Sequence, residues 1–215
     1  DDLFKLATSR EIYTDAKNLK VFSNTLWWAL IVTAASTVIG VIIARFADQP
    51  MPLGFYDDWV KAADEEAKHF NLICDCLEAL GSHYGALPAH AGMWRAAEDT
   101  ADDLMGRLAV VPMVLEARGL DVTPGMIGIF RKAGITQAVA ALEVIYAEEV
   151  AHVAFGSKWF HFLCGRHDTD PKDAFHALVR RYFHGSLKPP FNEEKRAEAG
   201  IPPDFYWPLA GTTAR

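Results

Sequence analysis

Two copies of one pattern, Glu-Glu-x-x-His, constrain the fold of this chain more than any other feature of its sequence. The first copy contains Glu66 and His69, and the second contains Glu149 and His152. Residues three apart on an α-helix share a face, so each copy would present a carboxylate and an imidazole to the same point. Both copies lie in long apolar-periodic stretches, where a buried charge is costly unless it is paired or bound to a cation. The pattern therefore predicts two facing helices with metal between them.

The length and composition of the chain indicate a single compact domain. Its 215 residues are 51% hydrophobic, which is ample for a full core. The net charge of -7 argues against a general nucleic-acid-binding surface, because such a surface needs basic residues to displace counterions from phosphate. The 3 cysteines show no disulfide-framework spacing, which favours a reducing compartment and predicts a cytoplasmic protein.

One uncharged segment, from Leu26 to Ala44, permits a second interpretation of the protein's location. It is long enough to cross a bilayer, and Trp27 and Trp28 stand where an interfacial aromatic belt would lie. A helix that is buried on all sides in a bundle has the same apolar character. We favour the buried helix, and membrane association through this segment is the alternative.

The chain after this point reads as helices separated by short breakers, without any alternating run of strand length. We expect the third helix to be kinked at Pro112 and to stop at Gly119, before a turn over residues 121–125. The expected helices cover roughly residues 26–46, 55–80, 91–118, a short stretch ending near 132, 135–164 and 171–184.

This pattern divides the chain into three segments. Residues 1–24 are mixed and polar and are expected to form an arm, and residues 25–185 are expected to form an all-α bundle. Residues 186–215 are rich in proline and aromatic residues, which predicts an irregular tail. Because its aromatic side chains favour burial, we expect the tail to wrap across the bundle or to contact a partner.

The third helix adds one more carboxylate to the two metal-binding pairs. Glu116 precedes Glu149 by about the length of chain needed to go along one helix, turn and return on the next. Oxygen and imidazole ligands of this kind suit iron or manganese. The predicted metal ligands, from three helices, are Glu66, His69, Glu116, Glu149 and His152.

The sequence resembles the ferritin-like di-metal carboxylate superfamily in four stretches: DDWVKAADEEAKHF, ALGSHYGALPAH, LEARGLDVTPGM and YAEEVAHVAFGSKWF. More narrowly, it resembles a branch distantly similar to the transfer-RNA methylthio-isopentenyl-adenosine hydroxylase. The resemblance implies a four-helix bundle with additional short helices, holding two divalent metal ions. It also implies that Glu66 and Glu149 bridge the metals. By position, His69 and His152 match the imidazole ligands, and Glu116 matches the lone Glu of the third helix.

The first helix departs from that family pattern. Where the family places a second lone Glu, this chain has small and hydroxyl residues over 32–37, and no acidic residue lies between Asp15 and Asp48. Two divalent ions would bring four positive charges against three carboxylates, an excess that is costly in a low-dielectric interior. A metal-bound hydroxide could supply the missing charge. Alternatively, the position nearer His69 binds metal weakly or stays empty.

Three functions fit these observations. The first is a di-iron oxidoreductase that activates dioxygen to oxidise a small organic substrate. The second is a metal-binding or ferroxidase-type protein without an organic substrate. The third is a structural or membrane-associated subunit with a degenerate metal site. The small residues of the first helix leave room for a substrate and favour the first function, and its apolar character predicts packing against another copy in a homo-oligomer.

Several neighbouring residues receive a structural interpretation. Glu65 and Glu148 could contact the predicted ligands and support them. Each precedes a ligand and faces away from it by about 100°, however, so we favour a solvated or inter-helix role. Tyr146 lies one turn from Glu149 and is interpreted as a core tyrosine. No role is assigned to the histidines outside the two motifs.

Overall fold

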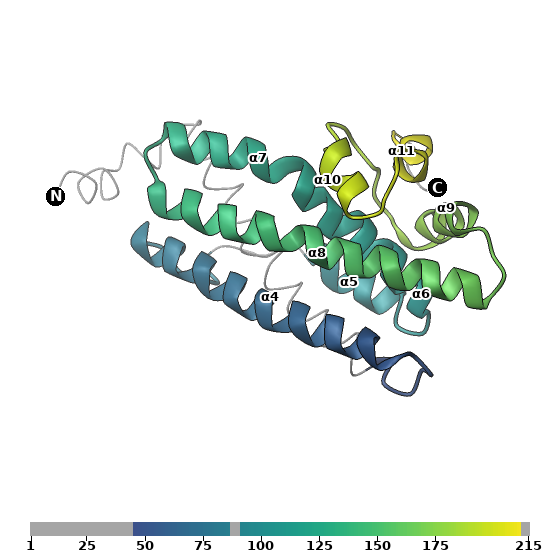
Figure 1. Ribbon diagram of the computed structural model, residues 1–215. Helices are drawn as coiled ribbons and strands as arrows, with labels where there is room; N and C mark the ends of the chain where they lie inside the picture. Colours follow the sequence, from purple (N-terminus) through teal and green to yellow (C-terminus); the bar gives the residue numbers. More distant parts are fainter. Residues whose placement is uncertain (1–44, 87–90, 212–215) are drawn as a thin grey trace.

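Three long helical rods lie side by side and carry the interior of the protein (Figure 1). The computed structural model describes residues 45–86 and 91–211 of the chain. The middle rod of the three runs antiparallel to the other two (Figure 1). The rods are α4 (Leu53–Ala79), then α6 (Leu104–Val110), the π-helical segment η1 (Val111–Glu116) and α7 (Ala117–Lys132) joined end to end, and α8 (Thr136–Arg166), which lies in the middle.

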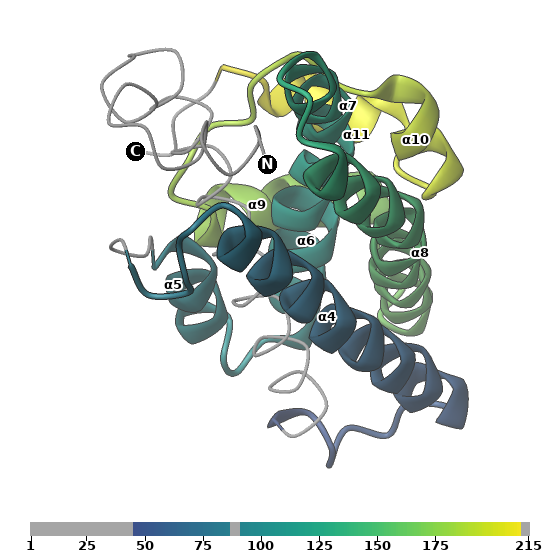
Figure 2. The same ribbon diagram turned by 90° about the vertical axis from the view of Figure 1, so that its left-hand side faces the viewer.

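Shorter helices gather at one end of the rods (Figure 1). The view in Figure 2 shows α6 between α8 and α9. Within the described residues the structure contains no strand, only an isolated bridge between Leu187 and Ala210, so the all-α prediction is confirmed. The shorter helices are α5 (Gly92–Asp99), α9 (Pro171–Tyr182), α10 (Glu193–Glu198), α11 (Pro203–Tyr206) and the 3-10 turn η2 (Trp207–Leu209).

Two predictions for the N-terminal part lie outside the described residues. These are the polar arm over 1–24 and the apolar helix from Leu26 to Ala44, so the fourth rod of the predicted four-helix bundle stays a prediction. The domain boundaries also stay predictions. Among the helices that the structure describes, none is both long and apolar enough to cross a membrane.

The rod α4 forms where its apolar residues recur at alternating spacings of three and four. Its buried stripe includes Phe55, Trp59 and Ala62, and it continues through Glu66 and His69. Full burial of one large apolar side chain contributes about 1.5–3 kcal/mol, so the apolar members of the stripe fix α4 against its neighbours. The two polar residues are carried into the interior because they occupy positions of the same stripe.

The second rod differs from its prediction at two points. We expected one helix from about residue 91 to Gly119, but the chain breaks after α5, and Asp103 caps α6 by accepting a hydrogen bond from the Gly106 amide at 2.8 Å. The stop at Gly119 and the turn over 121–125 are wrong, because α7 runs through both.

Contacts from the C-terminal tail explain why α7 continues past Pro124. Proline has no amide hydrogen, so it leaves the carbonyl of Leu120 without its helical donor. The side-chain amide of Asn192 donates to this carbonyl at 3.1 Å. Inside the helix, the Thr123 hydroxyl donates to the Gly119 carbonyl at 2.8 Å. The sequence signals for a turn are therefore overridden by a contact with a residue far along the chain.

The expected disturbance at Pro112 is present, and it takes the form of the π-helical segment η1. At this segment η1 lies very close to α8, because a Cβ atom on Gly156 would fall 2.4 Å from Cγ of Pro112. Any other residue at position 156 would force the two rods apart. This contact is one turn from Glu116 on one rod and one turn from His152 on the other, so it fixes how closely those two side chains approach.

The C-terminal tail packs on the rods and contains the short helices α10 and α11. Tyr206 is fully buried, Phe205 is 5% exposed, and the ring of Tyr206 lies 4.7 Å from that of Phe191. The expected burial of the tail aromatics is found for Phe205 and Tyr206 but not for Trp207, which is 45% exposed, and the tail is more helical than expected. All three cysteines lie within the described residues and carry free thiols.

Candidate metal centre

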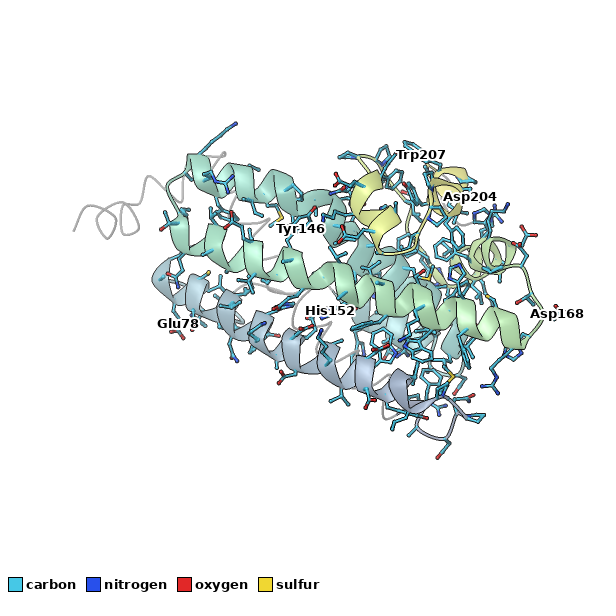
Figure 3. All side chains as sticks on the ribbon, in the orientation of Figure 1. Glu78, Tyr146, His152, Asp168, Asp204 and Trp207 are labelled. Atoms are coloured by element: carbon cyan, nitrogen blue, oxygen red, sulfur yellow. The ribbon has the colours of Figure 1, made fainter. Side chains whose placement is uncertain are left out.

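Four predicted ligands meet at one point between α4 and α8. Each offers one donor atom, and these atoms lie within 4.8 Å of one another. Glu66, His69 and His152 are fully buried, and Glu149 is 6% exposed. Figure 3 shows His152 between α8 and α4. Among the described residues, these four side chains form the group whose acidic and histidine donor atoms are spaced closely enough to hold a metal ion.

Both inner carboxylates face both imidazoles. Oε1 of Glu66 lies 3.2 Å from Nδ1 of His69 and 3.2 Å from Nδ1 of His152. The two oxygens of Glu149 divide between the rings, with Oε1 3.9 Å from Nδ1 of His69 and Oε2 3.7 Å from Nδ1 of His152. Each of these two carboxylates therefore faces both imidazoles, so the four side chains surround one shared space.

The outer nitrogens of the two imidazoles contact the opposite helix. Nε2 of His69, on α4, lies 2.8 Å from Oε2 of Glu148 on α8. Nε2 of His152, on α8, lies 2.9 Å from Oε2 of Glu65 on α4. A carboxylate on the outer nitrogen fixes the tautomer and orientation of a ring and makes its inner nitrogen a better metal ligand.

These outer contacts are the supporting role that the sequence analysis considered for Glu65 and Glu148 but did not favour. The inter-helix role predicted for Glu65 and Glu148 is present, but their partners are the imidazoles of the site. A residue that faces away from the ligand pair of its own helix can still reach the pair on the next helix. The sequence signal for this role was the second Glu of each motif, because both copies carry a Glu immediately before the inner Glu.

The fifth predicted ligand, Glu116, lies beside the four-residue group. Its side chain is 3% exposed, and its charge interacts with Glu66, Glu149 and His152. It stands at the end of η1, where the π-helical turn and the close contact of Pro112 with Gly156 bring the second rod against α8. The side chain of Glu116 is therefore on the His152 side of the cluster.

Polar atoms at the centre of the cluster find no hydrogen-bond partner in the described part of the chain. Buried polar groups are nearly always paired, and each unpaired one costs about 1–3 kcal/mol. Several such atoms around one point are what a bound cation would satisfy, so these residues fit a metal ion. The unpaired atoms are Oε2 of Glu66, both carboxylate oxygens of Glu116 and Oε2 of Glu149.

The cluster shifts the pKa values of its members in opposite directions. Burial raises the pKa of Glu116 and Glu149, and repulsion between the carboxylates adds to the rise. Burial opposes the charged form of His152, but attraction to Glu149 and Glu66 prevails and raises its pKa to about 11. The same balance raises the pKa of His69 and lowers that of Glu66. Without a cation, the cluster therefore holds a proton on His152, which a metal ion must displace.

Other residues considered in the sequence lie apart from this group. Tyr146 accepts a hydrogen bond from Asn192 at 2.8 Å and lies on the side of α8 that faces α10 (Figure 3). Nδ1 of His161 donates to the carbonyl of Ser157 at 2.8 Å, and His176 contacts the tail. The hydroxyl residues over 32–37 lie outside the described residues.

Comparison with known proteins gives a family but no activity. A protein of Haemophilus influenzae, described as "Uncharacterized protein", is 39% identical over 149 residues. The match covers 69% of this chain and 52% of that protein, so the chain spans about half the length of this relative. No solved structure matches the chain. The resemblance to ferritin-like proteins and to the transfer-RNA hydroxylase stays a prediction. Because residues 19–207 match its family model, the chain belongs to the family described as "Protein of unknown function (DUF455)".

Proposed function

We propose that this protein binds two divalent metal ions, iron or manganese, between α4, α8 and η1, and acts as an oxidoreductase on a small organic substrate. One observation carries the metal proposal. Donor atoms of Glu66, His69, Glu149 and His152 are buried within 4.8 Å of one another, and carboxylate oxygens of Glu66, Glu149 and the neighbouring Glu116 have no hydrogen-bond partner within residues 45–86 and 91–211. Burying these polar groups without a partner is costly, so a role in packing alone does not explain why they are there.

The arrangement of the inner carboxylates supports two ions rather than one. Glu66 and Glu149 each face both imidazoles, and each imidazole has its own outer carboxylate. Two equivalent half-sites that share two carboxylates suit a pair of ions. Glu116 would complete the half-site of His152, and the half-site of His69 would have fewer protein ligands and an open position.

The ligand set and its burial support redox chemistry. Carboxylate and imidazole ligands favour iron or manganese over softer metals. When bound, such a metal pair supplies electrons for reactions with dioxygen. The chain's own contribution is to orient the imidazoles through Glu65 and Glu148 and to exclude water, since three of the four central side chains are fully buried.

Metal content measured on variants of α8 tests this proposal. We expect about two iron or manganese ions per wild-type chain, as in di-metal carboxylate bundles. His152→Ala should lose most of this metal. The matched control is His161→Ala, which removes another histidine of the same helix that lies outside the cluster and should leave the metal content unchanged.

The oxidoreductase part has its own readout. Protein loaded with Fe(II) should consume dioxygen faster than His152→Ala treated in the same way. Equal metal content in the wild type and in His152→Ala would contradict the metal site. Normal metal content without any dioxygen consumption would retain the site and contradict the oxidoreductase.

A further inference from the structure

The C-terminal tail crosses the two rods that carry Glu116 and Glu149. We define residues 188–196 of the tail as the strap. It begins where Arg118 of α7 donates to the carbonyls of Lys188 and Pro190, at 2.7 and 3.0 Å. It ends in α10, which contacts both α7 and α8. The strap is therefore attached to both rods.

One side chain of the strap joins the two rods directly. The side-chain amide nitrogen (Nδ2) of Asn192 donates to the Leu120 carbonyl on α7 at 3.1 Å and to the Tyr146 hydroxyl on α8 at 2.8 Å. Both hydrogens of this amide are used. The Oδ1 atom of Asn192 accepts from the Lys195 amide at 3.2 Å, which caps α10 and holds the side chain in place.

A buried ion pair holds the strap on α7. Nε and Nη2 of Arg196 donate to the two oxygens of Asp121 at 2.8 and 2.7 Å. The backbone amide of Asn192 also donates to Asp121, at 2.9 Å. Arg196 is 2% exposed, and its guanidinium carbon lies 5.1 and 4.7 Å from the ring centroids of Phe191 and Tyr206, which contact each other. This geometry leaves the strap little freedom to shift.

Asn192 contacts each rod one helical turn from a predicted ligand. Leu120 is one turn after Glu116 on the second rod, and Tyr146 is one turn before Glu149 on α8. We infer that the strap is a positioning device for the metal centre, with Asn192 setting the place of Glu116 relative to Glu149. The inference rests on the proposed metal-binding function.

The second rod needs such support because of its own sequence. Pro112 precedes Glu116 and Pro124 follows it, and each proline removes a helical hydrogen bond. The segment between them also contains the π-helical turn, so the helix that carries Glu116 is weakened on both sides. Asn192 donates to the Leu120 carbonyl, which has no helical donor because Pro124 lacks an amide hydrogen. A tail that only covered apolar surface would not need to donate at this carbonyl.

Asn192→Ser separates positioning from helix capping. Serine still caps a helix well, so α10 keeps its N-cap, but serine lacks the amide that reaches both rods. The measurement is Mn(II) binding to metal-free protein, followed by the electron paramagnetic resonance signal of free Mn(II). We expect the tighter of the two positions to weaken by about tenfold, as other supporting groups around metal ligands do.

A double-mutant cycle with Glu116→Gln shows whether the effect acts through Glu116. If it does, Asn192→Ser should cause no further loss in the Glu116→Gln background. Tyr146→Phe, which removes only the α8 end of the bridge, should weaken Mn(II) binding in the same direction. The control is Lys172→Ala, which removes an exposed pair with Asp204 outside the strap and should leave Mn(II) affinity unchanged.

The outcomes separate this inference from the function on which it rests. Normal binding by the wild type, with losses from Asn192→Ser and Glu116→Gln that simply add, would overturn the positioning role alone. Unchanged affinity in Asn192→Ser would do the same. No Mn(II) binding by the wild type would overturn the proposed function and, with it, the role of the strap at a metal site.

Discussion

Two buried carboxylates on the second rod, Asp121 and Glu116, have opposite surroundings. Asp121 accepts hydrogen bonds from Nε and Nη2 of Arg196 and from the backbone amide of Asn192, all between 2.7 and 2.9 Å. Glu116, little more than one turn away, accepts no hydrogen bond from any described residue. The same helix therefore presents one acid with complete protein partners and one with none.

This difference teaches how to interpret the cluster around Glu116. Where a buried acid serves the fold, this chain supplies a bidentate arginine from the far end of the sequence. Where Glu66, Glu116 and Glu149 meet, no lysine or arginine of the described residues comes within ion-pairing distance. The contrast within one rod supports a cation from solution as the partner of the second group.

Replacing Arg196 should have the largest effect on stability. Arg196→Met leaves Asp121 buried without its cation, which should lower the free energy of unfolding by about 3–5 kcal/mol. Urea unfolding in the presence of a chelator measures it. Combining Arg196→Met with Asp121→Asn should recover most of the loss. If Arg196→Met were as stable as the wild type, the pair would not be what holds the strap.

Replacing Glu149, in contrast to replacing Arg196, should not lower the stability of the metal-free protein. Its pKa is raised by burial and by the nearby Glu66 carboxylate, so its charge is unfavourable without metal. Glu149→Gln should therefore leave the metal-free protein as stable as the wild type or more stable. It should also abolish the stabilisation by Mn(II), which is about 2.7 kcal/mol at a metal concentration 100 times the dissociation constant. Thermal unfolding with and without Mn(II) tests both statements, and a marked loss of stability in chelator would end the contrast with Asp121.

The outer carboxylates should have a smaller effect on metal affinity. Glu148→Gln and Glu65→Gln each keep the shape of the side chain but weaken its hold on an imidazole. Each should lower Mn(II) affinity by about 10–100-fold, since such supporting contacts are worth that much elsewhere. Glu143→Gln, which alters an exposed pair on the same helix, serves as the control. Equal affinity in all three variants would show that the outer contacts do not support the site.

The smallest single step that we expect is the change in metal affinity over one pH unit. The pKa of His152 is raised to about 11, so the metal-free protein holds this proton throughout the neutral range. A metal ion must displace it, and affinity should fall by about tenfold per pH unit for each proton displaced as the pH drops. With an ordinary histidine pKa of 6.5, the dependence would level off above neutral pH. Mn(II) titrations between about pH 6 and 8 distinguish the two cases.

The sequence was sufficient to predict the rods whose apolar stripes are continuous. In α4 and α8 the ligand pairs occupy positions of the buried stripe, so periodicity alone placed Glu66, His69, Glu149 and His152 on facing surfaces. Local spacing and the apolar pattern carry this information. The prediction of four converging residues depended on nothing beyond those two helices.

The failures came from contacts between distant parts of the chain. The stop at Gly119 was wrong because Asn192 supplies the hydrogen bond that Pro124 removes, and local residues give no sign of such a donor. The supporting role of Glu65 and Glu148 was considered but not favoured, because a single helix shows which residues face together, but not which ring on a neighbouring helix they reach.

The crossed contacts of the two motifs have a consequence for engineering. Because Glu65 holds His152 while Glu148 holds His69, each copy of Glu-Glu-x-x-His contains half of the other copy's binding apparatus. Grafting one copy into a foreign helical scaffold would transfer an imidazole without its orienting acid. A transplant would have to carry both copies on antiparallel helices in this register, since sliding one helix by a single turn would separate both pairs together.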